Sequence, residues 1–309
     1  MAASSLLLLL ACLAAEPDFV YQRAGHDADV VTPVSGGVVL MGGGRDVAEA
    51  FVWMIERSGG GDFLVLRASG TDAYNSFVLR QGAANSAATL ILRTREASSD
   101  PVVLEKVRQA EAIFLAGGDQ WNYIRQWKDT PLAALLQERI ALGVPVGGTS
   151  AGLAVLGEHY FSAEHDSVTS AEALADPFHF RVTLGSGFLR IPHLEGLITD
   201  SHFMARGREG RLLAFLARLS ARGVGVDEAT AVLLEPDGKS SVVGRNAAHF
   251  YSLSSEGVVC AAGQALEIPS AQVERVSSGG RFDFAGWKGT GEAESLTVKA
   301  GAILKAERP

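Results

Sequence analysis

Short apolar runs alternate with helical segments between residues 36 and 156, and this alternation constrains the fold more than any other feature. The apolar runs lie at 36–41, 63–67, 89–92, 112–115 and 144–146, and the predicted helices lie at 47–57, 101–109 and 131–142. Uninterrupted apolar strands are typical of a sheet buried on both faces, and the helices between them make right-handed crossovers between parallel strands. We therefore predict an α/β protein whose mostly parallel sheet is flanked by helices.

The composition excludes several classes of protein. The chain has 309 residues, 47% of them hydrophobic and 20% charged, so it can bury a large core in one domain with an appendage or in two domains. A formal net charge of -8, without an extended face rich in Lys and Arg, argues against nucleic-acid binding. Only Cys12 and Cys260 are cysteines, and no His-Glu-x-x-His motif occurs, so we predict no metal and no cofactor.

The first residues have the pattern of a secretory leader. The apolar run from Leu6 to Ala15 is too short to span a bilayer and is followed by Glu16 and Pro17. We predict a signal peptide over 1–15 and a secreted or periplasmic protein without a membrane span. The segment before the apolar run lacks the Lys or Arg that such leaders usually carry. A lipoprotein anchor at Cys12, which follows Leu9-Leu10-Ala11, is the alternative.

A serine lies between the last apolar strand of this series and the helical run that follows. Ser150 stands in Gly148-Thr149-Ser150-Ala151-Gly152, which fits a sharp strand-to-helix turn that holds a nucleophile away from its own strand. Glycines suit such a turn because the backbone comes close to neighbouring elements. In a chain with 35 glycines the motif alone is weak, but its position after a strand and before a helix favours a nucleophile.

Other candidate residues follow neighbouring strands, because sites in parallel sheets form at the carboxyl ends of the strands. The backbone N–H groups of Gly117 or Gly118 and of Ala151 would form an oxyanion hole, although the two glycines could equally serve a turn alone. His202 follows the strand at 196–200, just before a helix predicted from Met204 to Ser220, and is the predicted general base. Either Asp227 or Glu228 follows the strand at 223–226 in the position of a carboxylate that orients this histidine.

The remaining segments carry less chemistry. The loop at 42–46 lacks the third glycine of a dinucleotide-binding motif, and we interpret it as a tight loop near the active site. Irregular residues at 161–189 are a candidate lid or substrate wall. We expect one α/β domain over 30–253, with a hairpin at 236–238, and a small β extension over 254–309.

Four motifs in this order resemble the cyanophycinase and aspartyl dipeptidase family of serine peptidases, peptidase family S51. They are Gly117-Gly118-Asp119-Gln120, the serine motif at 148–152, Thr199-Asp200-Ser201-His202-Phe203 with the arginines that follow, and 225–231 around Glu228. The resemblance covers 36–253 and implies a fold similar to class I glutamine amidotransferases (flavodoxin-like), with Ser in place of Cys. The chain order Ser, His, Glu also differs from that of α/β-hydrolases.

The resemblance implies roles for single residues. Ser150 would be the nucleophile, His202 the base and Glu228 the orienting carboxylate. Residues implied to bind substrate are Gln120, Asp200, Ser201, Arg206, Arg208 and Arg211, and the guanidinium groups could clamp a substrate carboxylate.

The implied substrate is a peptide with an aspartyl or β-aspartyl linkage, with cyanophycin as one candidate. Ser201 stands where cyanophycinases commonly carry Gln, and its shorter side chain removes a reach toward the substrate. The alternatives are an Asp-X or isoaspartyl dipeptidase and a non-catalytic binding protein on the same fold. The sequence does not fix the oligomeric state and leaves a homodimer open.

Overall fold

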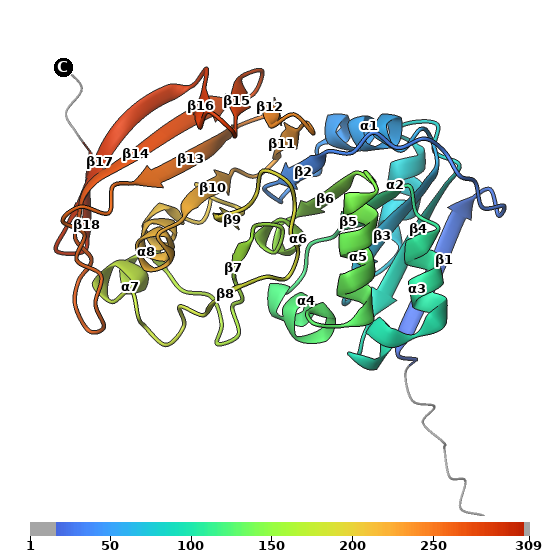
Figure 1. Ribbon diagram of the computed structural model, residues 1–309, viewed down its shortest axis with the longest axis horizontal. Coiled ribbons are helices and arrows are strands. Elements are labelled where there is room, and N and C mark those ends of the chain that lie inside the picture. Colours follow the sequence, from blue (N-terminus) through green and yellow to red (C-terminus); the bar gives the residue numbers. More distant parts are fainter. Residues whose placement is uncertain (1–16, 306–309) are drawn as a thin grey trace, which may run out of the picture.

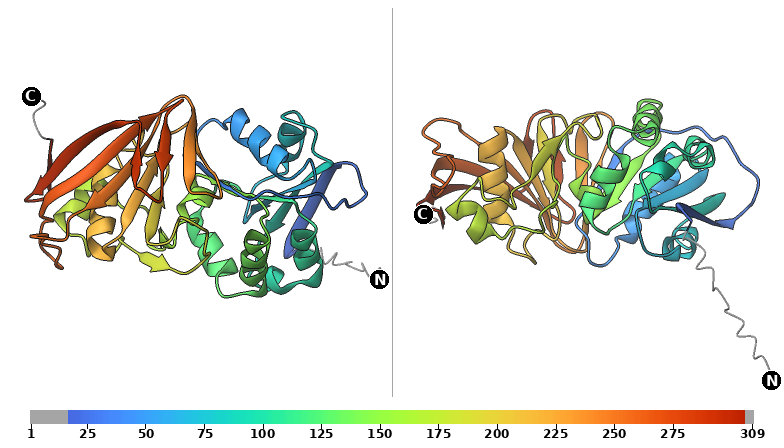
Figure 2. Two further views of the ribbon diagram at one scale, coloured as in Figure 1. Left: turned by 45° about the horizontal axis from the view of Figure 1, so that its top comes forward. Right: turned by 90° about the horizontal axis from the view of Figure 1, so that it is seen from below.

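The computed structural model describes residues 17–305. The predicted signal peptide at 1–15 and Cys12 lie outside the described residues. Within 17–305, no helix combines the length and the apolar character needed to cross a membrane. Two sheets make up the frame of the protein, and they lie side by side, with the N-terminal half in blue and green and the C-terminal half in yellow to red (Figures 1 and 2).

The first sheet has ten strands and contains the parallel core that the sequence predicts. Five strands in the order β4-β3-β5-β6-β2 run parallel, and β1 at one end and β11, β12, β15 and β16 at the other pair antiparallel. In spatial order the strands are β1 (Phe19–Gly25), β4 (Ser86–Leu92), β3 (Asp62–Arg67), β5 (Ala112–Leu115), β6 (Val146–Thr149), β2 (Val38–Met41), β11 (Thr230–Leu234), β12 (Lys239–Gly244), β15 (Arg281–Asp283) and β16 (Lys288–Gly289).

The second sheet has eight strands, and most of its pairs are antiparallel. Only β7, β9 and β10 run parallel within it. The strands in spatial order are β18 (Ala302–Lys305), β17 (Glu292–Lys299), β14 (Ile268–Ser277), β13 (Ala247–Leu253), β10 (Arg222–Val226), β9 (Leu197–Asp200), β7 (His159–Phe161) and β8 (Leu184–Ser186).

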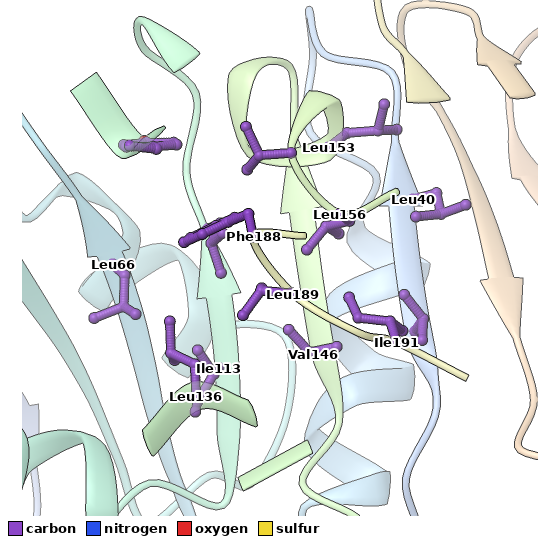
Figure 3. Packing of buried hydrophobic residues seen from close by; sticks show 14 of the residues in the cluster. Leu40, Leu66, Ile113, Leu136, Val146, Leu153, Leu156, Phe188, Leu189 and Ile191 are labelled. Atoms are coloured by element: carbon purple, nitrogen blue, oxygen red, sulfur yellow. The ribbon is translucent and has the colours of Figure 1, made fainter. Parts of the chain in front are cut away.

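Helices cover both faces of the first sheet, which explains its uninterrupted apolar strands. The helices are α1 (Ala48–Arg57), α2 (Ala73–Leu79), α3 (Pro101–Arg108), α4 (Gln120–Trp127), α5 (Pro131–Ala141), α6 (Ala151–Ala154), α7 (Ser170–Ala175) and α8 (Glu209–Leu219), with a 3₁₀ turn at Glu96–Ser99. On β2, Val39 belongs to the cluster with Phe51 of α1, whereas Leu40 belongs to the cluster with Leu136 of α5. Figure 3 shows the second cluster, in which Phe188 and neighbouring residues of the 161–189 segment pack over the strands.

The ends of two helices follow the rules from which they were predicted. The side chain of Asp100 accepts a hydrogen bond from the backbone N–H of Val102, and Pro101 is the first residue of α3. Thr130 caps α5 in the same way by accepting from the N–H of Ala133. Both helices therefore begin where the sequence predicts.

The prediction of an α/β fold with parallel strands and flanking helices is confirmed, but the expectation of one mostly parallel sheet is not. The structure is mixed α/β with two sheets, each only partly parallel. The strands beyond 253 also join the second sheet, where β14 pairs with β13 along seven residue pairs. Contacts between the sheets seal the junction, since the ring of Phe250 on β13 stacks on that of Phe282 on β15 at a centroid distance of 3.6 Å.

The helix expected from Met204 begins five residues later, at Glu209. His202 and Gly207 have left-handed φ values of 47° and 58°, which an α-helix cannot include. Residues 201–207 therefore form a chain of turns, and α8 starts only after them.

Candidate active site

The turn at Ser150 joins β6 directly to the four-residue helix α6. Ser150 has φ 54° and ψ -114°. This backbone conformation is strained for any residue other than glycine. Both flanking glycines are required because a side chain would clash there. A Cβ on Gly148 would lie 2.6 Å from the carbonyl carbon of Gly152, and one on Gly152 would lie 2.0 Å from the carbonyl oxygen of Leu115. The serine motif is therefore a tightly packed turn that presents the Ser150 hydroxyl beyond the strand.

Three side chains from distant parts of the chain form a continuous chain of hydrogen bonds. The Ser150 Oγ lies 2.7 Å from the His202 Nε2. The other ring nitrogen, Nδ1, lies 2.6 Å from the Glu228 Oε1. With Nδ1 protonated and donating to the carboxylate, Nε2 is free to accept the serine proton. The arrangement has the order hydroxyl, imidazole and carboxylate that activates a serine.

The hydrogen bonds between these three side chains form where the two sheets meet. Ser150 follows β6 of the first sheet, His202 follows β9 of the second, and Glu228 lies in the turn that connects β10 of the second sheet to β11 of the first. All three strand ends converge in the middle of the molecule (Figure 1). The positions therefore depend on how the two sheets are joined.

The glycine loop after β2 packs directly on this group. The carbonyl of Gly42 accepts a hydrogen bond from the N–H of His202, and that of Gly43 accepts one from the N–H of Ala229. A Cβ on Gly43 would lie 2.6 Å from the Cε1 and Nε2 atoms of His202, and one on Gly44 would lie 3.0 Å from the Cβ of Glu228. The predicted tight loop near the active site is thus present, and its glycines leave room for the imidazole.

The structure distinguishes between the two acidic residues that the sequence left open. Glu228 contacts the imidazole of His202, whereas Asp227 turns the other way. The carboxylate of Asp227 accepts from the N–H groups of Met204 and Ala247 and contacts the Nε2 of His249 at 3.2 Å. Burial alone would raise the pKa of Asp227, but the hydrogen bond and charge of His249 and the two N–H donors outweigh it and hold the pKa low. Asp227 therefore links the turn that follows His202 to the start of β13.

The surroundings of His202 favour its neutral form. Burial is the largest effect and lowers the pKa of the imidazole, the hydrogen bond to Glu228 raises it, and the positive charges of Arg206 and Arg208 lower it again. The net result is a pKa below the usual histidine value. A neutral imidazole at neutral pH is the state in which His202 can accept a proton.

The glycines that follow β5 lie beside the serine. A Cβ on Gly117 would approach the Cβ of Ser150 to 3.4 Å and its Oγ to 3.8 Å. Gly118 is the next residue, and Ala151 is the first residue of α6. The backbone at Gly117 and Ala151 therefore flanks the hydroxyl. Because α6 has a single turn, its dipole adds little to the field that the individual N–H groups create.

The predicted substrate-binding residues separate into buried and accessible groups. The Arg211 side chain is only 2% exposed and donates twice to the carboxylate of Asp200, from Nε at 2.8 Å and from Nη2 at 2.5 Å. Arg208 also contacts Asp200, at 3.2 Å, and donates to the carbonyl of Ser201 at 2.7 Å. Burial lowers the pKa of Arg208 to about 10. The expected clamp on a substrate carboxylate is therefore not supported for Arg211, whose donors are occupied inside the protein.

Two other predicted residues lie at the accessible side of the site. Arg206 is exposed, its charge acts on His202, and no side-chain partner for it occurs among residues 17–305. Gln120 is half-buried at the start of α4, where its amide lies 3.4 Å from the carbonyl of Phe161 in the 161–189 segment. Both remain predictions as substrate contacts. Within the described part of the chain, no cluster of three or more His, Cys, Asp or Glu side chains is arranged to hold a metal ion.

We expect Asp200→Asn to destabilise the protein. The substitution removes the only carboxylate among residues 17–305 that contacts the buried guanidinium of Arg211, and an uncompensated buried charge typically costs about 3–5 kcal/mol. The free energy of unfolding, from urea denaturation, should fall by roughly this amount. Glu105→Gln breaks an exposed pair with Arg108 and is the control, for which we expect almost no change. Equal stability of the two variants would contradict a structural role for Asp200.

Comparison with known proteins identifies the family of the chain. Residues 68–242 match the profile of peptidase family S51, and the chain belongs to this family. Two curated relatives are cyanophycinases. The one from Geminocystis herdmanii is 35% identical over 176 residues, which cover 56% of this chain and 61% of that protein. The one from Trichormus variabilis is 33% identical over 158 residues, which cover 50% of each. The chain thus matches about half to three fifths of the length of these relatives.

A solved structure supports the fold. The crystal structure of a peptidase from an acI-B1 Actinobacterium superposes with a TM-score of 0.59 over 81% of this chain and 98% of that one. The sequences are 19% identical, so the likeness concerns the fold alone.

Proposed function

We propose that the protein is a serine-type peptidase that hydrolyses aspartyl or β-aspartyl amide bonds in a cyanophycinase-like reaction. The observation that carries the proposal is the uninterrupted contact from the hydroxyl of Ser150 through the imidazole of His202 to the carboxylate of Glu228. Membership of family S51 and the cyanophycinase relatives support the reaction class. The five parallel strands also support a fold similar to class I glutamine amidotransferases, with serine in place of their cysteine.

The geometry supports a two-step mechanism. His202 takes the proton of Ser150 while the oxygen attacks the carbonyl carbon of the scissile amide. The imidazolium, stabilised by Glu228, then gives the proton to the leaving amine as the tetrahedral intermediate collapses to an acyl-enzyme. A water molecule attacks the ester with His202 again as the base, and this releases the acid and restores Ser150.

The oxyanion of each tetrahedral intermediate needs hydrogen-bond donors beside Ser150. The N–H groups of Ala151 and of Gly117 or Gly118 are the candidates, because these residues flank the hydroxyl. Loss of one such donor typically costs about 3 kcal/mol of transition-state stabilisation. Backbone donors are held rigidly by the turns and need no reorganisation during the reaction.

Arg206 is the arginine that we propose for recognition of the substrate carboxylate. It is exposed, close enough to act on the pKa of His202, and free of an internal partner among the described residues. Arg208 and Asp200 would act indirectly by holding the turn at Ser201 and His202. An acidic group next to the scissile bond, as in an aspartyl residue, is the matching substrate feature.

We expect Arg206→Gln to shift the pH profile of kcat/KM. His202 acts as a base only when neutral, so activity rises with pH through its pKa, which lies below the usual value. Removing a nearby positive charge stabilises the imidazolium and raises this pKa, and the acidic limb should move to higher pH by less than about one unit. The KM for aspartyl substrates should rise as well. Arg190→Gln, at an exposed arginine of another segment, is the control; an unchanged acidic limb in Arg206→Gln would refute the electrostatic coupling.

The test of the proposed function is a panel of substrates. Purified protein is incubated with insoluble cyanophycin, with isoaspartyl dipeptides and with α-linked Asp-X dipeptides, and the released amines are measured. We expect hydrolysis of β-aspartyl linkages. Cleavage of the α-linked dipeptides alone would favour the Asp-X dipeptidase, and no hydrolysis of any member would favour the binding protein.

The predicted signal peptide at 1–15 supports a secreted or periplasmic location, which suits an enzyme acting on an insoluble polymer. Fractionation of cells that express the full chain tests this location. Recovery of the uncleaved chain in the cytoplasm would contradict it, and lipid attachment at Cys12 would favour the lipoprotein alternative.

A further inference from the structure

Two backbone N–H groups in the loop after β5 have no acceptor within residues 17–305. They belong to Gly117, which is half-buried, and to Gly118, which is exposed. A backbone donor that is shielded from water and lacks an acceptor is rare in a folded protein. Because Gly117 also approaches the side chain of Ser150, these donors are free to bind an oxyanion that forms there.

The carbonyl groups of the same loop contact one buried tyrosine, to which the proposed reaction gives no role. The hydroxyl of Tyr123 donates to the carbonyl oxygen of Ala116 at 2.7 Å and lies 3.4 Å from that of Gly117. Among residues 17–305, neither carbonyl accepts a hydrogen bond from any other donor. The orientation of these two peptide units therefore depends on the hydroxyl of Tyr123.

The planarity of the peptide bond converts these contacts into a direction for the N–H groups. In a trans peptide unit, the C=O bond and the N–H bond of the next residue point in opposite directions. The carbonyls of Ala116 and Gly117 face Tyr123, so the N–H groups of Gly117 and Gly118 point away from it. A Cβ on Gly118 would lie 3.6 Å from the Tyr123 hydroxyl, whereas one on Gly117 would lie 3.4 Å from the Cβ of Ser150. The loop therefore lies between the tyrosine hydroxyl and the serine.

The start of α4, which lies next to α6, holds Tyr123 in place (Figure 1). The side chain of Asp119 caps α4 by accepting from the N–H of Trp121, so Tyr123 stands in the first turn. Side chains on a helix lean toward its N-terminus, and this carries the hydroxyl back to the loop. The ring stacks on that of Trp127 at a centroid distance of 4.4 Å, and both side chains are buried. Burial raises the pKa of Tyr123, so its hydroxyl keeps the proton that it donates.

We propose that Tyr123 is a positioning residue of the oxyanion hole, whose hydroxyl holds the loop so that the N–H groups of Gly117 and Gly118 face the oxyanion at Ser150. Tyr123 acts through the loop and does not touch the reacting atoms. Without its hydroxyl, the two peptide units lose their donor and can rotate, and small displacements of a catalytic group are costly. The proposal rests on the proposed function, because a reaction through a tetrahedral intermediate is what requires these donors.

The test is Tyr123→Phe, which removes the hydroxyl and leaves the ring stacked on Trp127. With an isoaspartyl dipeptide, we expect kcat to fall by about tenfold to a hundredfold, up to the smallest loss seen when a whole oxyanion donor is removed. KM should stay within about twofold, because the donors bind the transition state more strongly than the substrate. A serine-directed phosphonate places its phosphoryl oxygen where the oxyanion forms. The rate at which it labels Ser150 should therefore fall by the same factor as kcat.

Ser98→Ala is the matched control, because it also removes one buried hydroxyl that supports α4. The hydroxyl of Ser98 donates to the backbone carbonyl of Gln126 at 3.0 Å. Each variant loses one buried hydrogen bond, so both should lower Tm by a similar amount. Only Tyr123→Phe should lower kcat and the labelling rate. An unchanged kcat in Tyr123→Phe, or equal losses of kcat in the two variants, would overturn the role of Tyr123 and leave the proposed reaction intact.

Phosphonate labelling separates failure of this proposal from failure of the proposed function, because labelling does not depend on which peptide is the substrate. If the wild-type protein is labelled but cleaves no β-aspartyl substrate, the proposed function falls. The labelling rates of Tyr123→Phe and Ser98→Ala then decide the role of Tyr123: a slower rate in Tyr123→Phe alone supports it, and equal rates overturn it. If the wild-type protein is neither active nor labelled, Ser150 is not an activated nucleophile, and both proposals fall.

Discussion

Ser150→Ala is expected to lower kcat for β-aspartyl substrates by roughly 10⁶-fold, the size of effect that removal of a serine nucleophile has in serine proteases. Among residues 17–305, the Ser150 hydroxyl is the only group that hydrogen-bonds to the His202 Nε2, so no other side chain of that part of the chain can replace it. The methyl group fits the same turn, and we expect no loss of folding. Steady-state kinetics with an isoaspartyl dipeptide and thermal unfolding measure the two effects.

A second substitution at the same position separates chemistry from backbone strain. Ser150→Gly also removes the nucleophile, but it relieves the strained φ of 54°. The glycine variant should therefore be inactive. Its free energy of unfolding should equal that of the wild type or exceed it by up to about 1 kcal/mol. Retained hydrolysis in either variant would mean that Ser150 is not the nucleophile.

Gly43→Ala is expected to lower kcat by about 10² to 10⁴-fold, the contribution that a general base typically makes. The added methyl group would lie 2.6 Å from the Cε1 and Nε2 atoms of His202, which is closer than carbon and nitrogen atoms approach without a bond. The imidazole must then move away from the Ser150 Oγ and lose the 2.7 Å contact. Steady-state kinetics and labelling of Ser150 by a serine-directed phosphonate should both show the loss.

Gly279→Ala is the matched control for the backbone effect. Gly43 and Gly279 have φ values of 94° and 87°, so alanine is strained at both, by about 1–3 kcal/mol. A Cβ on Gly279 meets no atom within 4 Å, and its loop lies between β14 and β15, away from Ser150. We expect Gly279→Ala to lose stability but keep its kcat. Full activity in Gly43→Ala would show that His202 tolerates displacement and would contradict its role as the base.

Much of the first sheet could be predicted because its signals are local. Pro101 after Asp100, and Pro131 after Thr130, begin α3 and α5 through caps that involve only neighbouring residues. The run at 38–41 is apolar at every position because helices cover both sides of β2. The prediction was least accurate where the backbone is unusual, as at His202, whose left-handed φ delays the start of α8.

The candidate site residues likewise fall into those that local patterns predict and those that only tertiary contacts identify. The position of His202 after a strand and of Ser150 in a glycine-flanked turn is readable from sequence pattern. The choice of Glu228 over Asp227 is not, because both follow β10 and only their contacts differ. Nor could the sequence tell that Arg211 is buried against Asp200 while Arg206, five residues earlier, is exposed.

The sequence by itself determined the parallel strands, the serine turn and the order of the three candidate catalytic residues, since each depends on a few adjacent side chains and on backbone sterics. Only the tertiary structure decided that two partly parallel sheets meet where β10 and β13 contact β11, that Gly43 packs on the imidazole, and that Arg45 and Arg245 line one cavity. These features depend on contacts between residues far apart in the chain. Such contacts are selected by how whole sheets pack together, which no local pattern records.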